Sequence, residues 1–176
     1  MDLRAYYFGN MYLSSIQQGI QAAHATADMF VKYQPFYTDE ECDESSSAYR
    51  MLTEWASNHK TMILLNAGFG SEIHDLVKFF NDDENPYPFA PFSEEEASLD
   101  GAITTVSIIL PEYIYEGAKQ IREGGPNATE ELRERGYVMF EDKSYLVNLI
   151  PQVVRKDISK WQFELICRLN NYGLAR

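Results

Sequence analysis

The chain has 176 residues, 45% of them hydrophobic and 14% aromatic, and its formal net charge is -12 at pH 7. This length and apolar content indicate a globular domain with a buried core, and they exclude an intrinsically disordered chain. The acidic balance repels phosphate, which excludes an extended nucleic-acid-binding surface but leaves room for a small local pocket.

The first predicted elements are a strand and a long helix. Residues 4–13 are rich in Tyr, Phe, Met and Leu, which favours a strand, and Ser14-Ser15 can cap the helix that follows. The helix is predicted over residues 16–33, because Gln34-Pro35 ends it. Its apolar residues recur at steps of three and four, and we expect one face to pack on the core through Ile16, Ile20, Ala23, Ala27 and Phe30.

The chain up to Pro111 continues as an alternation of helices and strands. An acidic, serine-containing stretch at residues 37–47 has the composition of a solvated loop. A helix, a strand, a helix and two strands follow in that order, predicted over residues 48–59, 61–65, 71–80, 89–92 and 103–110. This alternation predicts an α/β fold with three layers, in which helices cover both faces of a mixed sheet of about four strands.

The segment after Pro111 is predicted to be an α-rich C-terminal extension. Its expected elements are a helix to about residue 122, a short helix, a strand at residues 137–140 and a terminal helix at about residues 156–170. We therefore divide the chain into a domain at residues 1–111 and an extension at residues 112–176. The terminal helix is rich in apolar residues, and it either packs on the domain or forms a contact between subunits of a homo-oligomer.

A line of polar residues marks the first helix as a candidate site. Gln17, Gln21, His24 and Asp28 follow one another at steps of four, three and four, so their side chains stack along one side of the helix. Small neighbours such as Gly19 let a ligand or another backbone come close. Two interpretations are open: the floor of a shallow binding pocket, or the solvated face of an amphipathic helix.

The same helix carries a resemblance to a known family. The run Gln21-Ala22-Ala23-His24-Ala25, placed after a first strand, resembles the helix motif of type-2 peptidyl-tRNA hydrolases, Gly-Lys-Ile-Ala-Ala-Gln-x-x-His-Ala. Gln21 and His24 match the glutamine and histidine of that motif. Gln17 stands where the family has a lysine that belongs to its active site. The resemblance continues in order to Pro111 and covers about residues 4–111.

A second segment of the resemblance supplies the other candidate catalytic residues. The family has an aspartate and two threonines in its site, within Asp-x-Gly-Arg-Thr and Gly-Thr-x-Thr-Val. One alignment places Glu94 on the aspartate, Ser98 on the first threonine and, after a deletion of one residue, Thr105 on the last. The alignment without that deletion places Ser93 on the aspartate and Ala97 on the first threonine, which leaves an inactive site. Both alignments remain open.

Three functions follow as hypotheses. In the first, the chain is a divergent peptidyl-tRNA hydrolase-like enzyme that binds a nucleotide or an acylated tRNA 3′ end and hydrolyses an ester, with Glu94, Ser98, Thr105 and His24 as catalytic groups. Gln17, Gln21 and Asp28 would bind the ligand. In the second, the pocket holds a small nucleotide or a protein partner without turnover, as in a phage or mobile-element accessory protein. In the third, the chain is a structural oligomer.

Metals, cofactors and membranes are not expected to take part. The two cysteines, Cys42 and Cys167, belong to no paired spacing, so we expect free thiols rather than a metal site or a disulfide. The N-terminus lacks the features of a secretory signal. A membrane span needs an apolar run of about 18 residues, and no run in the sequence approaches that length. These observations predict a cytoplasmic protein that needs no cofactor.

Overall fold

The computed structural model describes residues 2–35, 47–95, 97, 100–123 and 158–175. The chain forms two compact units, one made of Met1–Leu110 with Gly173–Arg176 and the other of Pro111–Tyr172. Several sequence predictions lie outside the described residues: the strand at 137–140, the short helix before it, Cys42 and Ser98.

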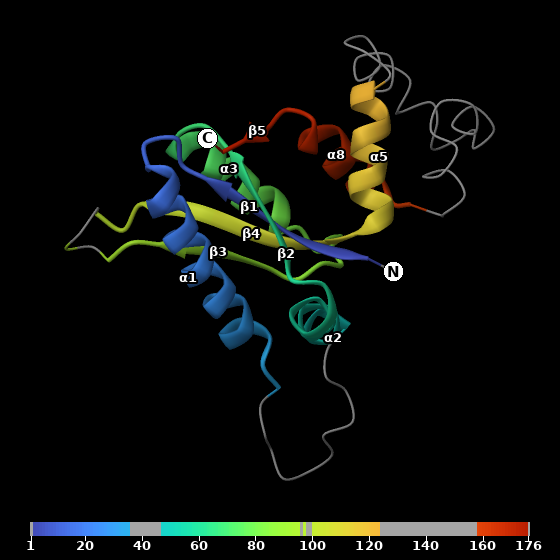
Figure 1. Cartoon of the computed structure of the whole chain (residues 1–176), viewed down its shortest axis with the longest axis horizontal. Helices are drawn as coiled ribbons and strands as arrows, with labels where there is room; N and C mark the ends of the chain where they lie inside the picture. The colour runs from blue at the N-terminus through green and yellow to red at the C-terminus, as the bar shows by residue number, and fades with distance from the viewer. Residues whose placement is uncertain (1, 36–46, 96, 98–99, 124–157, 176) are drawn as a thin grey trace. The chain divides into compact units, whose positions relative to one another are not determined.

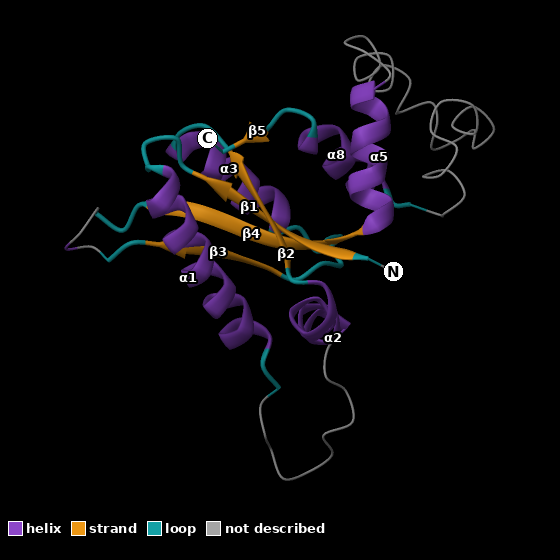
Figure 2. Ribbon diagram, viewed as in Figure 1, coloured by secondary structure: helices purple, strands orange, loops and turns teal. Residues whose placement is uncertain are grey.

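The first unit is built on a sheet with the strand order β3-β4-β1-β2-β5 (Figure 2). Its strands are β1 (Leu3–Gly9), β2 (Thr61–Asn66), β3 (Phe89–Ser93), β4 (Ile103–Pro111) and β5 (Gly173–Leu174). β1 and β2 pair in parallel, whereas β2 pairs with β5 and β3 pairs with β4 in antiparallel fashion. The sheet is therefore mixed, as predicted.

Alternating side chains of β1 produce the three layers. Leu3, Ala5 and Tyr7 join a core cluster with Ala22 and Met29, which lie on α1 (Ser15–Tyr33). Phe8 points to the other face of the sheet, where its ring lies 5.6 Å from that of Phe80 on α3 (Gly70–Phe80). Because successive strand residues face opposite sides, helices cover both faces of the sheet (Figure 1), as the sequence predicts.

The sheet has one strand more than the four or so expected. β5 (Gly173–Leu174) pairs with the end of β2 through Leu65 and Asn66, and the Ala175 amide donates to the Leu64 carbonyl at 3.0 Å. A strand of two residues is too short to show an alternating pattern, so nothing in the sequence indicates it.

The core face predicted for the first helix is wrong. The buried residues of α1 are Gln18, Gln21, Ala22, Ala25 and Met29. Ile16 is 79% and Ile20 50% exposed, and Ala23 and Ala27 are exposed as well, so these four residues of the expected core face lie toward solvent. Phe30, the fifth, is half-buried and packs against the core cluster as expected. Ala22 and Ala25 are fully buried because small side chains let the helix lie close to the sheet. When a helix has apolar residues on two opposite sides, each side shows the helical period. In α1 the isoleucines lie on the side that faces solvent, and periodicity alone pointed to that side.

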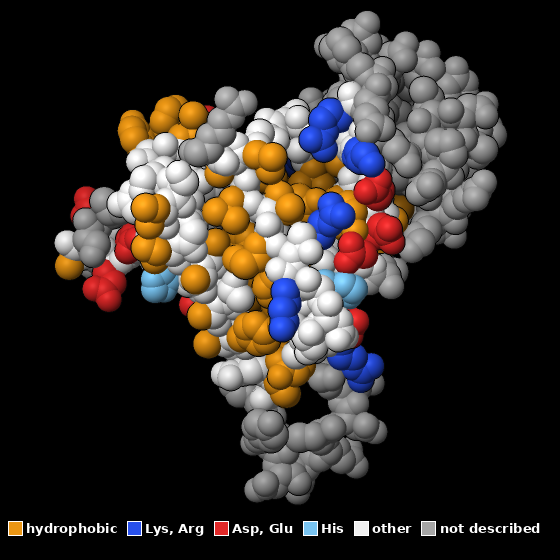
Figure 3. Space-filling model, in the orientation of Figure 1, with side chains coloured by type: hydrophobic (Ala, Val, Ile, Leu, Met, Phe, Trp, Pro, Cys, Tyr) orange, Lys and Arg blue, Asp and Glu red, His pale blue; other side chains and the backbone are white. Residues whose placement is uncertain are grey.

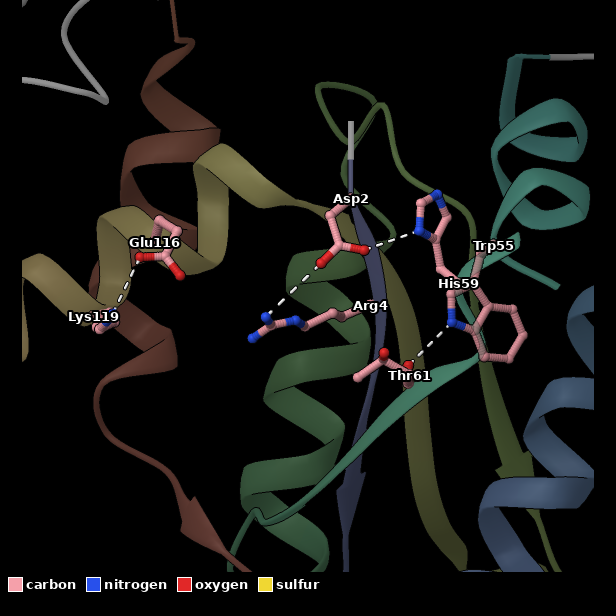
Figure 4. A network of polar contacts seen from close by, with 7 residues as sticks. All are labelled: Asp2, Arg4, Trp55, His59, Thr61, Glu116 and Lys119. Carbon is pink, nitrogen blue, oxygen red and sulfur yellow. Dashed lines mark hydrogen bonds and ion pairs between the residues drawn. The ribbon is translucent and has the colours of Figure 1, made fainter. Parts of the chain in front are cut away.

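A change of helix type separates α2 from β2. The sequence predicts one helix over residues 48–59, but the structure has α2 (Ser47–Glu54) followed by a π-helix, η1 (Trp55–His59), which ends at Lys60 with a left-handed φ of 56°. Trp55 Nε1 donates to the Thr61 carbonyl at 3.0 Å. The end of η1 is also tied to β1, because His59 Nδ1 lies 2.9 Å from Asp2 Oδ1 (Figure 4).

The second unit contains two described helices, α5 (Glu112–Glu123) and α8 (Lys160–Leu169), which pack on each other. Gln162 Nε2 donates to Tyr113 Oη at 3.2 Å across this pair, and Lys119 and Glu116 form an ion pair along α5 (Figure 4). The apolar side of α8 is buried, as its sequence leads one to expect. In the part of the chain that the structure describes, no helix is long and apolar enough to cross a membrane.

Candidate functional site

The candidate site lies where one flank of α1 meets the end of β3. Gln21 Nε2 donates a hydrogen bond to Glu94 Oε1 at 2.5 Å, although the two residues are 73 positions apart in sequence. Glu94 directly follows β3, and its own amide donates to the Ala102 carbonyl at 3.0 Å across the β3–β4 hairpin. The helix therefore holds the Glu94 carboxylate, and the hairpin holds the Glu94 backbone.

A pair of stacked rings lies one helical turn further along α1. The His24 and Phe92 rings are 4.7 Å apart at their centroids and nearly parallel, with an interplanar angle of 12°. His24 is exposed and Phe92 is half-buried. Phe92 fixes the imidazole against the strand, which leaves the other side of the imidazole toward solvent.

Simple geometry explains why these two pairs occur together. Gln21 and His24 are three residues apart on a helix and so share one side of it. Phe92 and Glu94 are two residues apart, the spacing that places strand side chains on one face, although Glu94 is just past the strand. The helix side and the strand face then meet pairwise, Gln21 with Glu94 and His24 with Phe92.

The amide of Gln21 is only partly used. Gln21 is 7% exposed, and among the described residues its Oε1 has no hydrogen-bond partner. A buried amide oxygen without a donor is unfavourable by about 1–3 kcal/mol, so this end of the Gln21 side chain opposes the stability that its bond to Glu94 contributes.

Thr105 is placed differently from Glu94. Its side chain is 1% exposed, and its hydroxyl donates to the Phe8 carbonyl at 3.2 Å, which links β4 to β1. Thr105 pairs with Phe92 in the β3–β4 register, so the two side chains are neighbours on the same face of the sheet. Its hydroxyl is directed into the sheet and does not face solvent.

Gln17 and Asp28 lie away from the Gln21–Glu94 contact. The Gln17 side-chain oxygen accepts from the Ser14 amide and the Ser14 hydroxyl, each at 2.9 Å, which completes a capping box at the start of α1. Asp28 is exposed and follows Gln21 by seven residues, about 10 Å along the helix axis. Ser98 lies outside the described residues.

The structure also assigns a role to Gln18, which the sequence analysis did not single out. Gln18 is 5% exposed, and its Nε2 donates to the Asn10 and Leu13 carbonyls at 3.3 and 3.2 Å and to Asn66 Oδ1 at 3.4 Å. It thereby ties α1 to the carboxyl ends of β1 and β2. A Cβ at Gly9 would come within 3.3 Å of Gln18 Oε1, so a glycine before the loop was the available signal for this close approach.

The site carries little positive charge. Lys32 is the one basic residue of α1, and its ammonium group donates to the Phe89 carbonyl at 3.1 Å and lies 3.5 Å from the centre of the Phe89 ring. Burial lowers the pKa of Lys32. Within the described ranges, no group of three or more His, Cys, Asp and Glu residues is arranged to hold a metal ion.

Comparison with known proteins adds no relative. No protein-family model matches the chain, and no curated protein is significantly similar to it. The link to type-2 peptidyl-tRNA hydrolases therefore rests on the residues already named.

Proposed function

We propose that this chain binds a nucleotide or the acylated 3′ end of a tRNA through the flank of α1 that carries Gln21 and His24. The observation that carries the proposal is the Gln21–Glu94 hydrogen bond beside the His24–Phe92 stack. We further propose that the domain descends from the type-2 peptidyl-tRNA hydrolases and acts in the cytoplasm.

The stacked rings supply the first part of the recognition. Nucleobases stack on aromatic rings with little dependence on sequence, and each such contact is worth about 1–3 kcal/mol. The imidazole of His24 is exposed on the side away from Phe92, so a base placed there would extend the stack by one ring.

The polar pair supplies the second part. Glu94 is half-buried and accepts from Gln21 through one oxygen, which leaves its other oxygen for an exocyclic amine of a base or a ribose hydroxyl. Ligand atoms that donate rather than accept therefore fit this site.

The charge of the chain restricts the ligand to a small one. The net charge is -12, and the exposed Glu95 follows Glu94 directly. Each additional phosphate near these carboxylates weakens binding, so we propose a nucleoside, a mononucleotide or a short 3′ end rather than an entire tRNA body.

Ester hydrolysis is the second candidate function. It is favoured by the fixed position of Glu94, because a carboxylate held by an amide donor beside an imidazole can orient and deprotonate water. Two groups implied by the resemblance are engaged elsewhere: the Thr105 hydroxyl donates to a backbone carbonyl, and the Gln17 amide caps α1. For this reason we place binding before turnover, in the manner of an accessory protein that sequesters its ligand.

The proposal is tested by isothermal titration calorimetry, in which AMP, CMP and a CCA trinucleotide are each titrated into the full chain. We expect His24→Ala to weaken binding by about tenfold, the loss of one stacking contact. Asp28→Ala is the matched control, because it removes another exposed polar side chain of the same helix. No binding of any of the three probes to the wild type, or equal losses in both variants, would contradict the proposal.

Turnover is tested separately with a peptidyl-tRNA substrate. If the chain is a binder, the wild type releases peptide no faster than Glu94→Gln, and the variant binds the CCA trinucleotide more weakly, because its amide offers a donor where the carboxylate offers a free acceptor. A rate that falls by about a hundredfold or more in Glu94→Gln with affinity unchanged would assign a general base to Glu94 and favour the enzyme.

A further inference from the structure

β3 is the outermost strand on one side of the sheet (Figure 2), so β4 holds it from one side only. The ladder between the two strands also loses its regular register between Phe92 and Ser93. Phe92 backs the His24 ring, and Glu94 follows the strand directly. The candidate site therefore depends on a strand that needs a second support on its open side.

The register of β3 shows which of its backbone groups face that open side. The Ile109 amide donates to the Pro88 carbonyl at 3.0 Å, and Phe89 pairs with Ile108 in the same ladder. Hydrogen-bonded and non-hydrogen-bonded pairs alternate in an antiparallel ladder, so the amide and the carbonyl of Phe89 point away from β4. Pro91 points the same way but has no amide hydrogen. Phe89 therefore carries both a donor and an acceptor on the open side.

The last turn of α1 binds both of these groups. Tyr33 Oη accepts from the Phe89 amide at 3.2 Å and donates to the Phe89 carbonyl at 3.3 Å. Lys32 Nζ donates to the same carbonyl at 3.1 Å. Burial raises the pKa of Tyr33, partly offset by its bond to Phe89, so the hydroxyl keeps its proton at neutral pH and can donate. The phenol therefore takes the place of the neighbouring strand residue that β3 lacks on this side.

The spacing of the contacts fixes the register of α1 against β3. Three contacts follow one another in opposite order along the two elements: Gln21 with Glu94, His24 with Phe92, and Tyr33 with Phe89. The outer two contacts are about 18 Å apart along the helix axis and about 17 Å apart along the strand. Because these lengths agree, the ring stack between them is held at one register.

Charge does not help to hold the hairpin end of β3. Glu94 and Glu95 follow the strand, Asp100 lies in the turn, and acidic side chains gather at this end of the hairpin, at the left of Figure 3. Like charges repel one another. Among the described residues this end is joined to α1 by the Gln21 amide and by no ion pair, so the contact at Phe89 has to fix the strand from its other end.

We infer that Tyr33 is a positioning residue of the candidate site, which its hydroxyl serves by fixing β3 at Phe89. Lys32 assists it through the same carbonyl. Tyr33 lies about 14 Å from His24 along the helix axis, so it acts through the strand rather than by touching a base stacked on His24. The effect on affinity rests on the proposed function, whereas the position of the two rings is a property of the free protein.

The test is proton NMR of the His24 imidazole in the full chain, at one fixed pH. Protons that lie over the face of an aromatic ring resonate upfield, so the stack on Phe92 shifts the His24 ring signals. Tyr33→Phe removes the hydroxyl and keeps the ring. We expect it to move the His24 signals toward their position in Phe92→Leu, which marks the unstacked imidazole. His59 and His74 are references in the same spectrum.

Tyr7→Phe is the matched control. It makes the same chemical change and also breaks a hydrogen bond of α1, between Tyr7 Oη and Thr26 Oγ1 at 2.6 Å, but that bond joins the helix to β1. A general loosening of α1 would move the His24 signals in both variants, whereas positioning through β3 moves them in Tyr33→Phe alone. Unchanged signals in Tyr33→Phe, or equal changes in the two variants, would overturn the inference.

Lys32→Met supplies a second variant that does not depend on the folding of Tyr33→Phe. It removes one donor to the Phe89 carbonyl and keeps an apolar stem, so it should move the His24 signals in the same direction by a smaller amount. No movement, or movement in the opposite direction, would contradict the inference.

Calorimetry with AMP separates this inference from the proposed function. Tyr33→Phe should weaken AMP binding by about threefold, because part of the binding energy is then used to order the stack. An affinity equal to that of the wild type would exclude Tyr33 from the site. If the wild type itself binds no AMP, the proposed ligand is wrong, and the His24 signals still decide whether Tyr33 positions the rings.

Discussion

Two histidines of the first unit show how the same side chain serves different ends. His59, at the end of η1, is 19% exposed and lies between the carboxylates of Asp2 and Glu54. His24, on α1, is exposed and has an aromatic ring behind it. The first contact fastens chain segments together at the start of β1. The second leaves an imidazole presented to solvent, which is the arrangement a ligand requires.

The difference predicts how each region responds to change. Variants around His59 should alter the free energy of unfolding and leave ligand affinity unchanged, whereas variants around His24 should do the reverse. Four substitutions test this separation.

Trp55→Ala should have the largest effect. Trp55 is 5% exposed, belongs to the core cluster and donates to the Thr61 carbonyl beside the His59 contact. Removing a buried tryptophan destabilises a protein by about 3–5 kcal/mol. Urea denaturation measures this loss, and affinity for nucleotide below the transition should stay within about twofold of the wild type. A small loss of stability would mean that η1 is not part of the cooperative core.

Tyr7→Phe should have the next largest effect, and only in alkali. Burial raises the pKa of the Tyr7 hydroxyl from 10.0 to about 12, partly offset by its hydrogen bond with Thr26. The folded state then holds more protons than the unfolded state between these values, so stability falls as pH rises through this window. The loss attributable to Tyr7 is about 2–3 kcal/mol. Denaturation at pH 10 and pH 12 should show this additional loss in the wild type relative to Tyr7→Phe.

Gln21→Ala should have an intermediate effect on both properties. Gln21 is nearly buried and donates to Glu94, so the variant loses a hydrogen bond worth about 0.5–1.5 kcal/mol. It also releases the Glu94 carboxylate, and nucleotide affinity should fall. Gln21→Glu is the comparison, because it keeps the length of the side chain but places two carboxylates together. An unchanged melting temperature in Gln21→Ala would show that the contact with Glu94 contributes nothing to folding.

His24→Ala should have the smallest effect on stability. The residue is exposed, and substitutions at such positions change the free energy of unfolding by less than about 0.5 kcal/mol. Thermal denaturation of the variant beside His59→Ala tests the comparison directly. If His24→Ala proves the more destabilising of the two, the ring stack is a structural contact and the proposed site loses its main feature.

The sequence could predict the elements of the first unit but not the orientation of its first helix. The residues of β4 are mostly apolar or β-branched and are buried along almost the whole strand, and such a run admits one interpretation. α1 has apolar residues on two sides, and the choice between them depends on Ala22 and Ala25 fitting against the sheet, which periodicity does not record. The π-helix and β5 were missed because the sequence carries no local signal for either.

The candidate site was also predicted only in part, because the sequence does not show which neighbours each side chain meets. The spacing of Gln21 and His24 places them together wherever the helix lies, and the structure brings Gln21 to Glu94. The use of a side chain is set by its neighbours, so the sequence could not indicate that the Thr105 hydroxyl serves a backbone carbonyl or that Gln17 serves as a cap. Gln18 went unnoticed because, although it directly follows Gln17, it lies about 100° further around the helix and so falls outside the polar line.

The pairing of β5 with β2 makes the second unit an insertion rather than a tail. The chain leaves the sheet after β4, forms residues 111–172, and returns to hydrogen-bond with Leu65 and Asn66. A truncation after Leu110 would therefore remove the strand that covers the carboxyl end of β2 and leave backbone donors and acceptors open at the edge of the sheet. Such an unprotected edge recruits strands from other molecules, so the shortened chain should aggregate more readily than the full chain.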